Sequence, residues 1–121
     1  MARSIEWWRS ATQHMWRTYF ALRNQQEEAV NKKTLPPAMS DTDVRIYEIC
    51  DNIYKNKFVR ADQEILKMYF TSRWGDDLYA VEDYSLKHNI PVNVIWIVIR
   101  KASRFAMEDV GLLDKKEGIE S

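Results

Sequence analysis

The residue types that most often perform catalysis are few in this chain and lie far apart in its sequence. The 121 residues include two histidines, His14 and His88, and one cysteine, Cys50. No motif is present that would place a nucleophile beside a base, pair cysteines around a metal, or cradle a phosphate with glycines. We therefore expect both histidines to be structural and Cys50 to be a small buried side chain. The chain is not expected to be an enzyme.

Adjacent acidic residues are a second feature that could suggest metal chemistry. They occur at Asp76-Asp77 and at Glu82-Asp83. A metal ion needs ligands that converge on one point, whereas neighbouring side chains on a helix diverge. We expect these carboxylates to cap a helix or to be solvated, and we expect neither a metal ion nor another cofactor.

The segment from residue 85 to residue 105 has a local excess of positive charge. It holds four basic residues and no acidic residue, although Lys plus Arg and Asp plus Glu are both 18 in the whole chain. A chain with no net charge does not coat DNA or an anionic membrane through bulk charge, so a DNA contact would have to be local. An ordinary solvated face is the alternative interpretation of this segment.

The same segment has the order of residue types that a helix-turn-helix requires. Ser85 is small enough to let a second helix cross, and Asn89 tolerates the left-handed backbone of a tight turn. Ile90 would fill the gap between the two helices, and Pro91 suits the first turn of the second helix. The residues expected to share the core with this unit are Ile65, Tyr69, Val81, Ile90, Ile95, Ile99 and Ala102.

Apolar residues recur along the chain at steps of three and four, which indicates helices. With three glycines and three prolines in all, we expect long helices with short connections. The predicted fold is a compact all-α domain of about five helices with a C-terminal helix-turn-helix over residues 78–110. The predicted parts are an aromatic N-terminal helix (1–33), a proline-containing linker (34–40), a helical domain (41–113) and a charged tail (114–121).

Particular residues set the predicted boundaries. Pro36 and Pro37 cannot continue a helix, Ser40 is a good N-cap, and Gly111 is expected to end the last helix as its C′ residue. The run Val92–Ile99 is rich in β-branched residues and resembles a buried strand. The polar residues on one side of this run favour a helix instead.

Residues 61–113 resemble the helix-turn-helix of sigma-factor region four. The run from Asp62 to Phe70 is similar to the helix that precedes the motif in that family, and the run from Arg100 to Ala106 is similar to its late helix. Small phage and prophage regulators of the ArpU, RinA and antiterminator-Q kinds share this layout and often end in an acid followed by Val-Gly or Leu-Gly. Here the corresponding residues are Glu108-Asp109-Val110-Gly111.

The resemblance implies a DNA-binding regulator of transcription, of the antitermination or late-gene activator type, in the cytoplasm of a bacterial host cell. Asn93 and Arg100 would approach bases, and Trp96 and Ile97 would contact thymine methyl groups or a protein. The remaining basic residues would contact phosphate. The residues expected to contact DNA are Lys87, Asn93, Trp96, Ile97, Arg100, Lys101 and Arg104.

The motif departs from the family at several positions. Asn89 stands where glycine is usual, and Pro91 and Val94 replace the common Ser and Thr, so hydroxyl groups that contact phosphate are missing. A second interpretation is therefore an interaction module that binds RNA polymerase or another protein. A third is a small DNA-packaging subunit, which also uses a helix-turn-helix.

Two further expectations concern assembly and membranes. The aromatic N-terminal helix would pack on the helical core or mediate self-association into a homo-oligomer, since aromatic residues dominate interface anchors. The longest apolar run, Val94–Ile99, has about six residues, far short of the ~20 that span a bilayer. We expect no membrane association.

Overall fold

Five α-helices and no strand make up the described part of the chain. The computed structural model describes the backbone of residues 5–72 and 76–120, and the side chains of residues 10–72, 76 and 78–110. The predicted all-α class and the predicted number of helices are confirmed. The helices are α1 (Ile5–Lys32), α2 (Asp41–Lys57), α3 (Arg60–Phe70), α4 (Asp77–His88) and α5 (Val92–Glu120).

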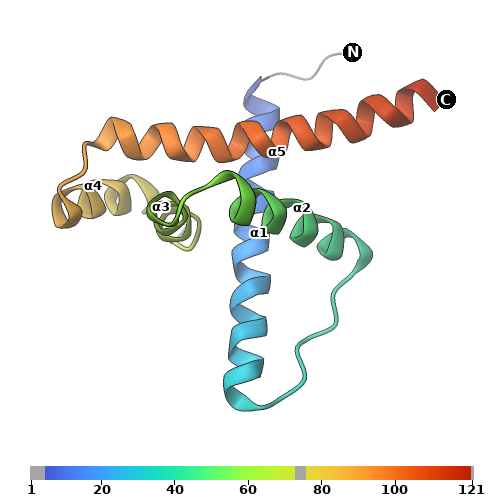
Figure 1. Cartoon of the computed structure of the whole chain (residues 1–121), viewed down its shortest axis with the longest axis horizontal. Coiled ribbons are helices and arrows are strands. Elements are labelled where there is room, and N and C mark those ends of the chain that lie inside the picture. The colour runs from blue at the N-terminus through green and yellow to red at the C-terminus, as the bar shows by residue number, and fades with distance from the viewer. Residues whose placement is uncertain (1–4, 73–75, 121) are drawn as a thin grey trace.

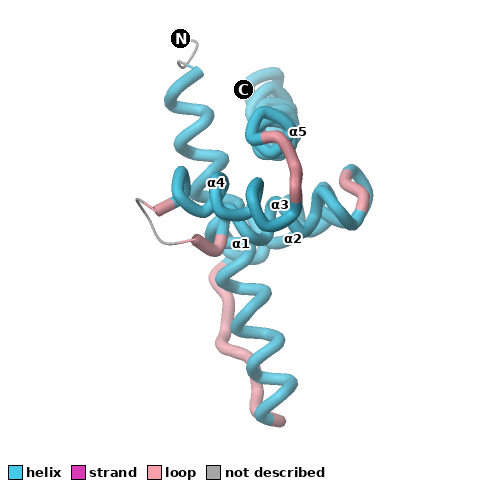
Figure 2. The backbone as a smooth tube through the Cα atoms, turned by 90° about the vertical axis from the view of Figure 1, so that its left-hand side faces the viewer, coloured by secondary structure: helices cyan, strands magenta, loops and turns pink. Residues whose placement is uncertain are grey.

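The two longest helices cross, and the three shorter helices gather around the crossing. Helix α5 runs across α1, which extends beyond α5 on both sides (Figure 1). Helices α2 and α3 both contact α1 and α5, and α4 packs on α3 and on α5. Figure 2 shows the linker after α1 running back beside that helix toward the start of α2.

An aromatic core fills the space beside the crossing. Trp16 and Tyr19 of α1 are fully buried. The ring of Trp16 stacks with the ring of Phe70 at a centroid separation of 5.9 Å, and its edge meets Tyr19 at 5.8 Å. These residues belong to the same core cluster as the buried side chains of α2, α3, α4 and α5. The N-terminal helix therefore packs on the core of the chain.

The predicted core positions are confirmed. Ile90 is half-buried and packs against the core, whereas the other six are buried. Helix α4 contributes Val81 to this core, while its Leu78, on the same helix, is exposed. The buried six are Ile65, Tyr69, Val81, Ile95, Ile99 and Ala102.

The turn between α4 and α5 has the predicted geometry. Asn89 is left-handed, with φ 53° and ψ 46°, and the amide of Ile90 donates a hydrogen bond of 3.1 Å to the carbonyl of Ser85. The hydroxyl of Ser85 in turn donates to the carbonyl of Ile90. The carbonyl of Pro91 accepts from the amide of Val94 at 3.0 Å, so the β-branched run that follows is helical, as predicted.

The predicted N-cap is confirmed, but the predicted end of the last helix is wrong. The Ser40 hydroxyl accepts a hydrogen bond of 3.1 Å from the amide of Asp43. Helix α5 continues through Gly111 to Glu120 and so extends into the segment predicted as a charged tail. A glycine inside a helix costs only about 1 kcal/mol relative to alanine, and the Leu, Lys and Glu residues that follow are strong helix formers.

Truncating Ile95 to alanine should lower the free energy of unfolding by about 2–5 kcal/mol, because the side chain is fully buried at 0% exposure and its loss leaves a cavity. The matched control is Ile97→Ala, two residues along the same helix, where the side chain is 47% exposed. That control should change the stability by less than about 0.5 kcal/mol. Urea unfolding followed by circular dichroism measures both, and equal effects would contradict the observed orientation of α5.

Two substitutions of Asn89 test whether its left-handed backbone conformation, and not its side chain, is what the turn requires. Asn89→Ala should destabilise the chain by about 1–2 kcal/mol, since an ordinary residue is strained in the left-handed region. Asn89→Gly should retain the stability of the natural chain, because glycine adopts this conformation without strain. Thermal unfolding would refute the explanation if glycine proved as harmful as alanine.

Candidate nucleic-acid interface

The exposed side of α5 carries most of the residues predicted to contact DNA. Asn93, Ile97, Arg100, Lys101 and Arg104 are exposed, whereas the opposite side of the helix faces the core. The spacing of these residues along a helix places them on one side over about 16 Å of its length, at 1.5 Å per residue. The structure therefore brings five of the seven predicted residues to one surface.

Three cations on this surface are not neutralised locally. Arg100, Lys101 and Arg104 form no ion pair with any described side chain. The guanidinium of Arg104 lies 5.6 Å from the ring centroid of its neighbour Phe105, and this contact leaves its charge available. Arg100 and Arg104 are four residues apart, so their side chains are neighbours on the helix surface. The middle of α5 therefore presents a cluster of positive charge.

Lys87 does not belong to this cluster. It lies on α4, and its ammonium is 2.9 Å from a carboxylate oxygen of Asp83, one turn earlier on the same helix. The hydrogen bond to Asp83 and the charge of that carboxylate raise the pKa of Lys87. A nearby negative charge weakens the attraction of this lysine for phosphate, so its predicted role is the least supported of the seven.

Trp96 is turned away from the exposed side. Its side chain is half-buried, and its ring meets Tyr69 of α3 nearly edge-on, at a centroid distance of 5.6 Å and an interplanar angle of 74°. Instead of facing outward, Trp96 lines a groove of about 620 Å³ between α1 and α5. The residues that line this groove are Gln13, Trp96, Ile99, Arg100, Ser103, Arg104 and Met107.

Three of these lining residues were not identified from the sequence. Gln13 belongs to α1, while Ser103 and Met107 belong to α5. The groove exists because two helices that are distant in the sequence cross, and no local pattern of residue types encodes the crossing. Arg100 and Arg104 lie both on the exposed side of α5 and along this groove.

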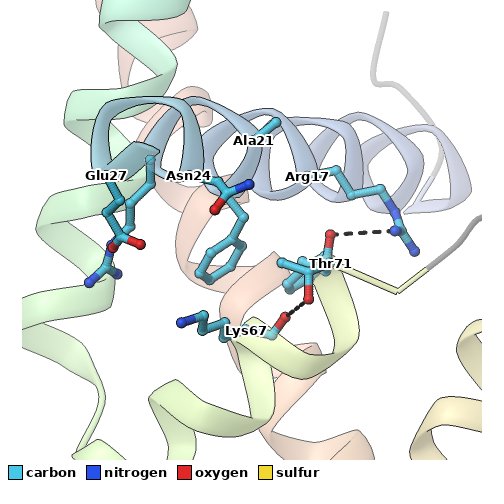
Figure 3. A pocket seen from close by; sticks show the side chains of 9 residues that line it. Arg17, Ala21, Asn24, Glu27, Lys67 and Thr71 are labelled. Carbon is cyan, nitrogen blue, oxygen red and sulfur yellow. Dashed lines mark hydrogen bonds and ion pairs between the residues drawn. The ribbon is translucent and has the colours of Figure 1, made fainter. Parts of the chain in front are cut away.

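A second cleft, of about 460 Å³, lies between α1 and the C-terminal end of α3 (Figure 3). Some of its polar side chains donate hydrogen bonds to the main-chain carbonyls at that end of α3. A guanidinium nitrogen of Arg17 donates to the carbonyls of Ser72 and Phe70, at 2.9 Å and 3.5 Å, and the Thr71 hydroxyl donates to the carbonyl of Lys67 at 2.6 Å. The carbonyl end of a helix attracts cations. Arg17 of α1 therefore connects α1 to the C-terminal end of α3.

The cysteine and the two histidines differ in their exposure. Cys50 is buried, and this burial, together with the charges of Asp109 and Asp51, raises the pKa of its thiol well above the ordinary range. His14 and His88 are both exposed. No cluster of three or more potential metal ligands occurs among the described residues.

Comparisons with protein-family models, with curated proteins and with solved structures found no match to this chain. Within the described part of the chain, none of the helices combines the length and the apolar character needed to cross a membrane. What the chain binds is therefore inferred from the charges and contacts of its own residues.

The burial of Cys50 predicts a thiol that is chemically silent in the folded chain. At pH 8 it should react with a disulfide reagent on the order of 100-fold more slowly than in urea, because both access and the thiolate form are suppressed. Absorbance of the released thiol measures the two rates, and Cys50→Ser gives the background. Similar rates in the folded and unfolded chain would show that Cys50 is accessible.

Proposed function

We propose that the chain is a DNA-binding regulator of transcription, of the antitermination or late-gene activator type found in phages and prophages, and that it acts by binding, not by catalysis. It would work in the cytoplasm of the bacterial host cell. The observation that carries this proposal is the unneutralised cluster of Arg100, Lys101 and Arg104 on the exposed side of α5. That helix follows α4 after a turn of three residues, which is a connection of the length found in helix-turn-helix motifs.

The types of side chain on this surface fit the two kinds of contact that such a helix makes. Asn93 lies in the first turn of α5, the part of a recognition helix that contacts base edges, and an asparagine amide pairs with adenine through two hydrogen bonds. An arginine in the same groove pairs with guanine or with phosphate. The major groove of B-DNA is about 12 Å wide and admits an α-helix.

Binding of this kind would have a modest dependence on salt. Three available cations correspond to a slope of log affinity against log salt of roughly −2 to −3, at about −0.9 per neutralised phosphate. The chain as a whole has no net charge, so no bulk attraction adds to this local term. A weak slope distinguishes this surface from that of a strongly basic DNA-binding protein.

One observation favours a second candidate function, an interaction module that binds RNA polymerase or another protein. Val92, Val94 and Ile97 are 38%, 42% and 47% exposed near the start of α5. Apolar side chains carry no hydrogen-bonding information for base edges, but they contribute to protein interfaces. A regulator of transcription that contacts both DNA and polymerase would use both kinds of residue.

Two alanine variants test the proposed DNA contact. Arg100→Ala should lose a base or phosphate contact worth about 1–3 kcal/mol. Lys101→Ala should weaken binding to all sequences alike and make the salt slope shallower by about one unit. Arg45→Ala removes the same charge from the exposed surface of α2 and should leave both quantities unchanged. Fluorescence anisotropy with genomic fragments at several salt concentrations provides the measurement.

The outcome that overturns the proposal is equally specific. If the natural chain binds no double-stranded DNA at low salt, or if both variants bind as the natural chain does, α5 does not contact DNA through this side. Ile97→Ala, which removes an exposed apolar side chain and leaves those cations in place, would then test the protein-binding alternative by pull-down of RNA polymerase.

A further inference from the structure

The groove between α1 and α5 is built differently from the exposed side of α5. Its deepest described residues, Ile99 and Ser103, are buried, while Trp96 and Met107 are half-buried along it. Gln13 of α1 contributes the opposite wall. Figure 1 shows α1 projecting beyond α5 on the side of the N-terminus.

A hydrogen bond and a ring contact hold the side chains beside the groove. The indole N–H of Trp16 donates a hydrogen bond of 3.0 Å to the carbonyl of Ala102, and this bond ties α1 to α5 beside the groove. Trp96 is fixed by its edge contact with Tyr69. A surface whose apolar walls are set before binding loses little conformational entropy when a partner fills it.

The charged side chains among the described lining residues of the groove are all positive. Arg100 and Arg104 are exposed along it, no acidic residue is among its described lining residues, and neither arginine forms an ion pair with a described side chain. The second cleft differs in this respect, because its Arg17 is engaged by backbone carbonyls and its Arg23 pairs with Glu27 at 3.5 Å. The groove thus has both apolar walls and available positive charge.

These features specify the chemistry of an occupant. Trp96 and Met107 offer a part-exposed apolar surface, which suits aliphatic and aromatic side chains of a protein. Arg100 and Arg104 are four residues apart and can each pair with a carboxylate in a bidentate way. Two acidic residues at positions i and i+4 of a partner helix have the same spacing as the two arginines.

The length of the groove sets the length of the occupant. From Trp96 to Met107 the helix rises about 16 Å, at 1.5 Å per residue, which corresponds to about three turns of a partner helix. An amphipathic helix of that length lays its apolar side into a groove through residues at i, i+3, i+4 and i+7. A single strand of nucleic acid would stack its bases on Trp96, but it would make less use of Met107.

We propose that the groove between α1 and α5 is a docking site for an acidic amphipathic helix of a partner protein, with its carboxylates paired to Arg100 and Arg104 and its apolar side on Trp96 and Met107. This site shares Arg100 and Arg104 with the proposed DNA contact, but its other residues line the groove and not the outward side of α5. It does not depend on that contact for its function.

A displayed library of random 15-residue peptides, selected on the full chain, tests this site. The enriched sequences should combine Leu, Ile, Met or Phe with Asp or Glu four residues apart. The most enriched peptide, synthesised with a fluorescent label, should bind at least about tenfold more weakly to Met107→Glu, because a carboxylate in the groove repels it. The isosteric variant Gln13→Glu should weaken it in the same direction, and circular dichroism verifies that both variants fold.

Arg45 on α2 provides the matched control for Met107→Glu. Arg45→Ala changes the net charge by the same amount as Met107→Glu but lies on α2, and it should bind the peptide as the natural chain does. Enrichment of peptides without acidic residues, or equal affinity for the natural chain and both groove variants, would overturn the proposal. So would an oligothymidine strand whose binding is lost in Met107→Glu while no peptide is enriched. Double-stranded DNA binding is measured separately, and its absence would refute the proposed function alone.

Discussion

The crossing of α1 over α5 at Trp16 and Ala102 is the contact on which the remaining arrangement depends. An indole N–H that is fully buried needs an acceptor, because leaving it unpaired costs about 1–3 kcal/mol. Here the acceptor is a main-chain carbonyl of α5. Ala102 is fully buried, and its small side chain lets Trp16 approach the backbone of α5 closely. This contact places the Ala102 side of α5 toward α1.

Once that side is fixed, the other surfaces of α5 follow from the geometry of a helix. Ile95 and Ile99 turn inward with Ala102, so Asn93, Lys101 and Arg104 must turn outward. The turn at Ser85 and Asn89 sets where α5 begins, and it closes α4 with hydrogen bonds that need no other part of the chain. The groove lies where α1 meets α5, and Gln13 of α1 and residues of α5 line it.

The fold was largely predictable from the sequence because its signals are local. The spacing of Ile95, Ile99 and Ala102, the tolerance of Asn89 for a left-handed backbone, and the capping hydroxyl of Ser40 each act within a few residues. Gly111 was misread because its cost inside a helix is small compared with the propensity of the residues after it.

The candidate site was predictable only in part, for the same physical reason. The exposed side of α5 follows from helical periodicity, whereas the groove pairs Gln13 with Met107, residues from opposite ends of the chain. The ion pair of Lys87 with Asp83 could have been predicted from their spacing of four residues along a helix. The contact of Trp96 with Tyr69 was not, since it depends on how α3 packs against α5.

The two proposed surfaces share Arg100 and Arg104, and this sharing has a consequence for how they would work together. A guanidinium makes the same bidentate pair with a carboxylate as with a phosphate, and a carboxylate paired to an arginine reduces its attraction for phosphate. A partner helix seated in the groove would therefore withdraw charge from the outward side of α5, where Lys101 would remain as the single available cation of the cluster. Because each neutralised phosphate contributes to affinity through released counterions, occupation of the groove would weaken the DNA contact. By thermodynamic linkage, DNA would weaken binding of the helix by the same factor.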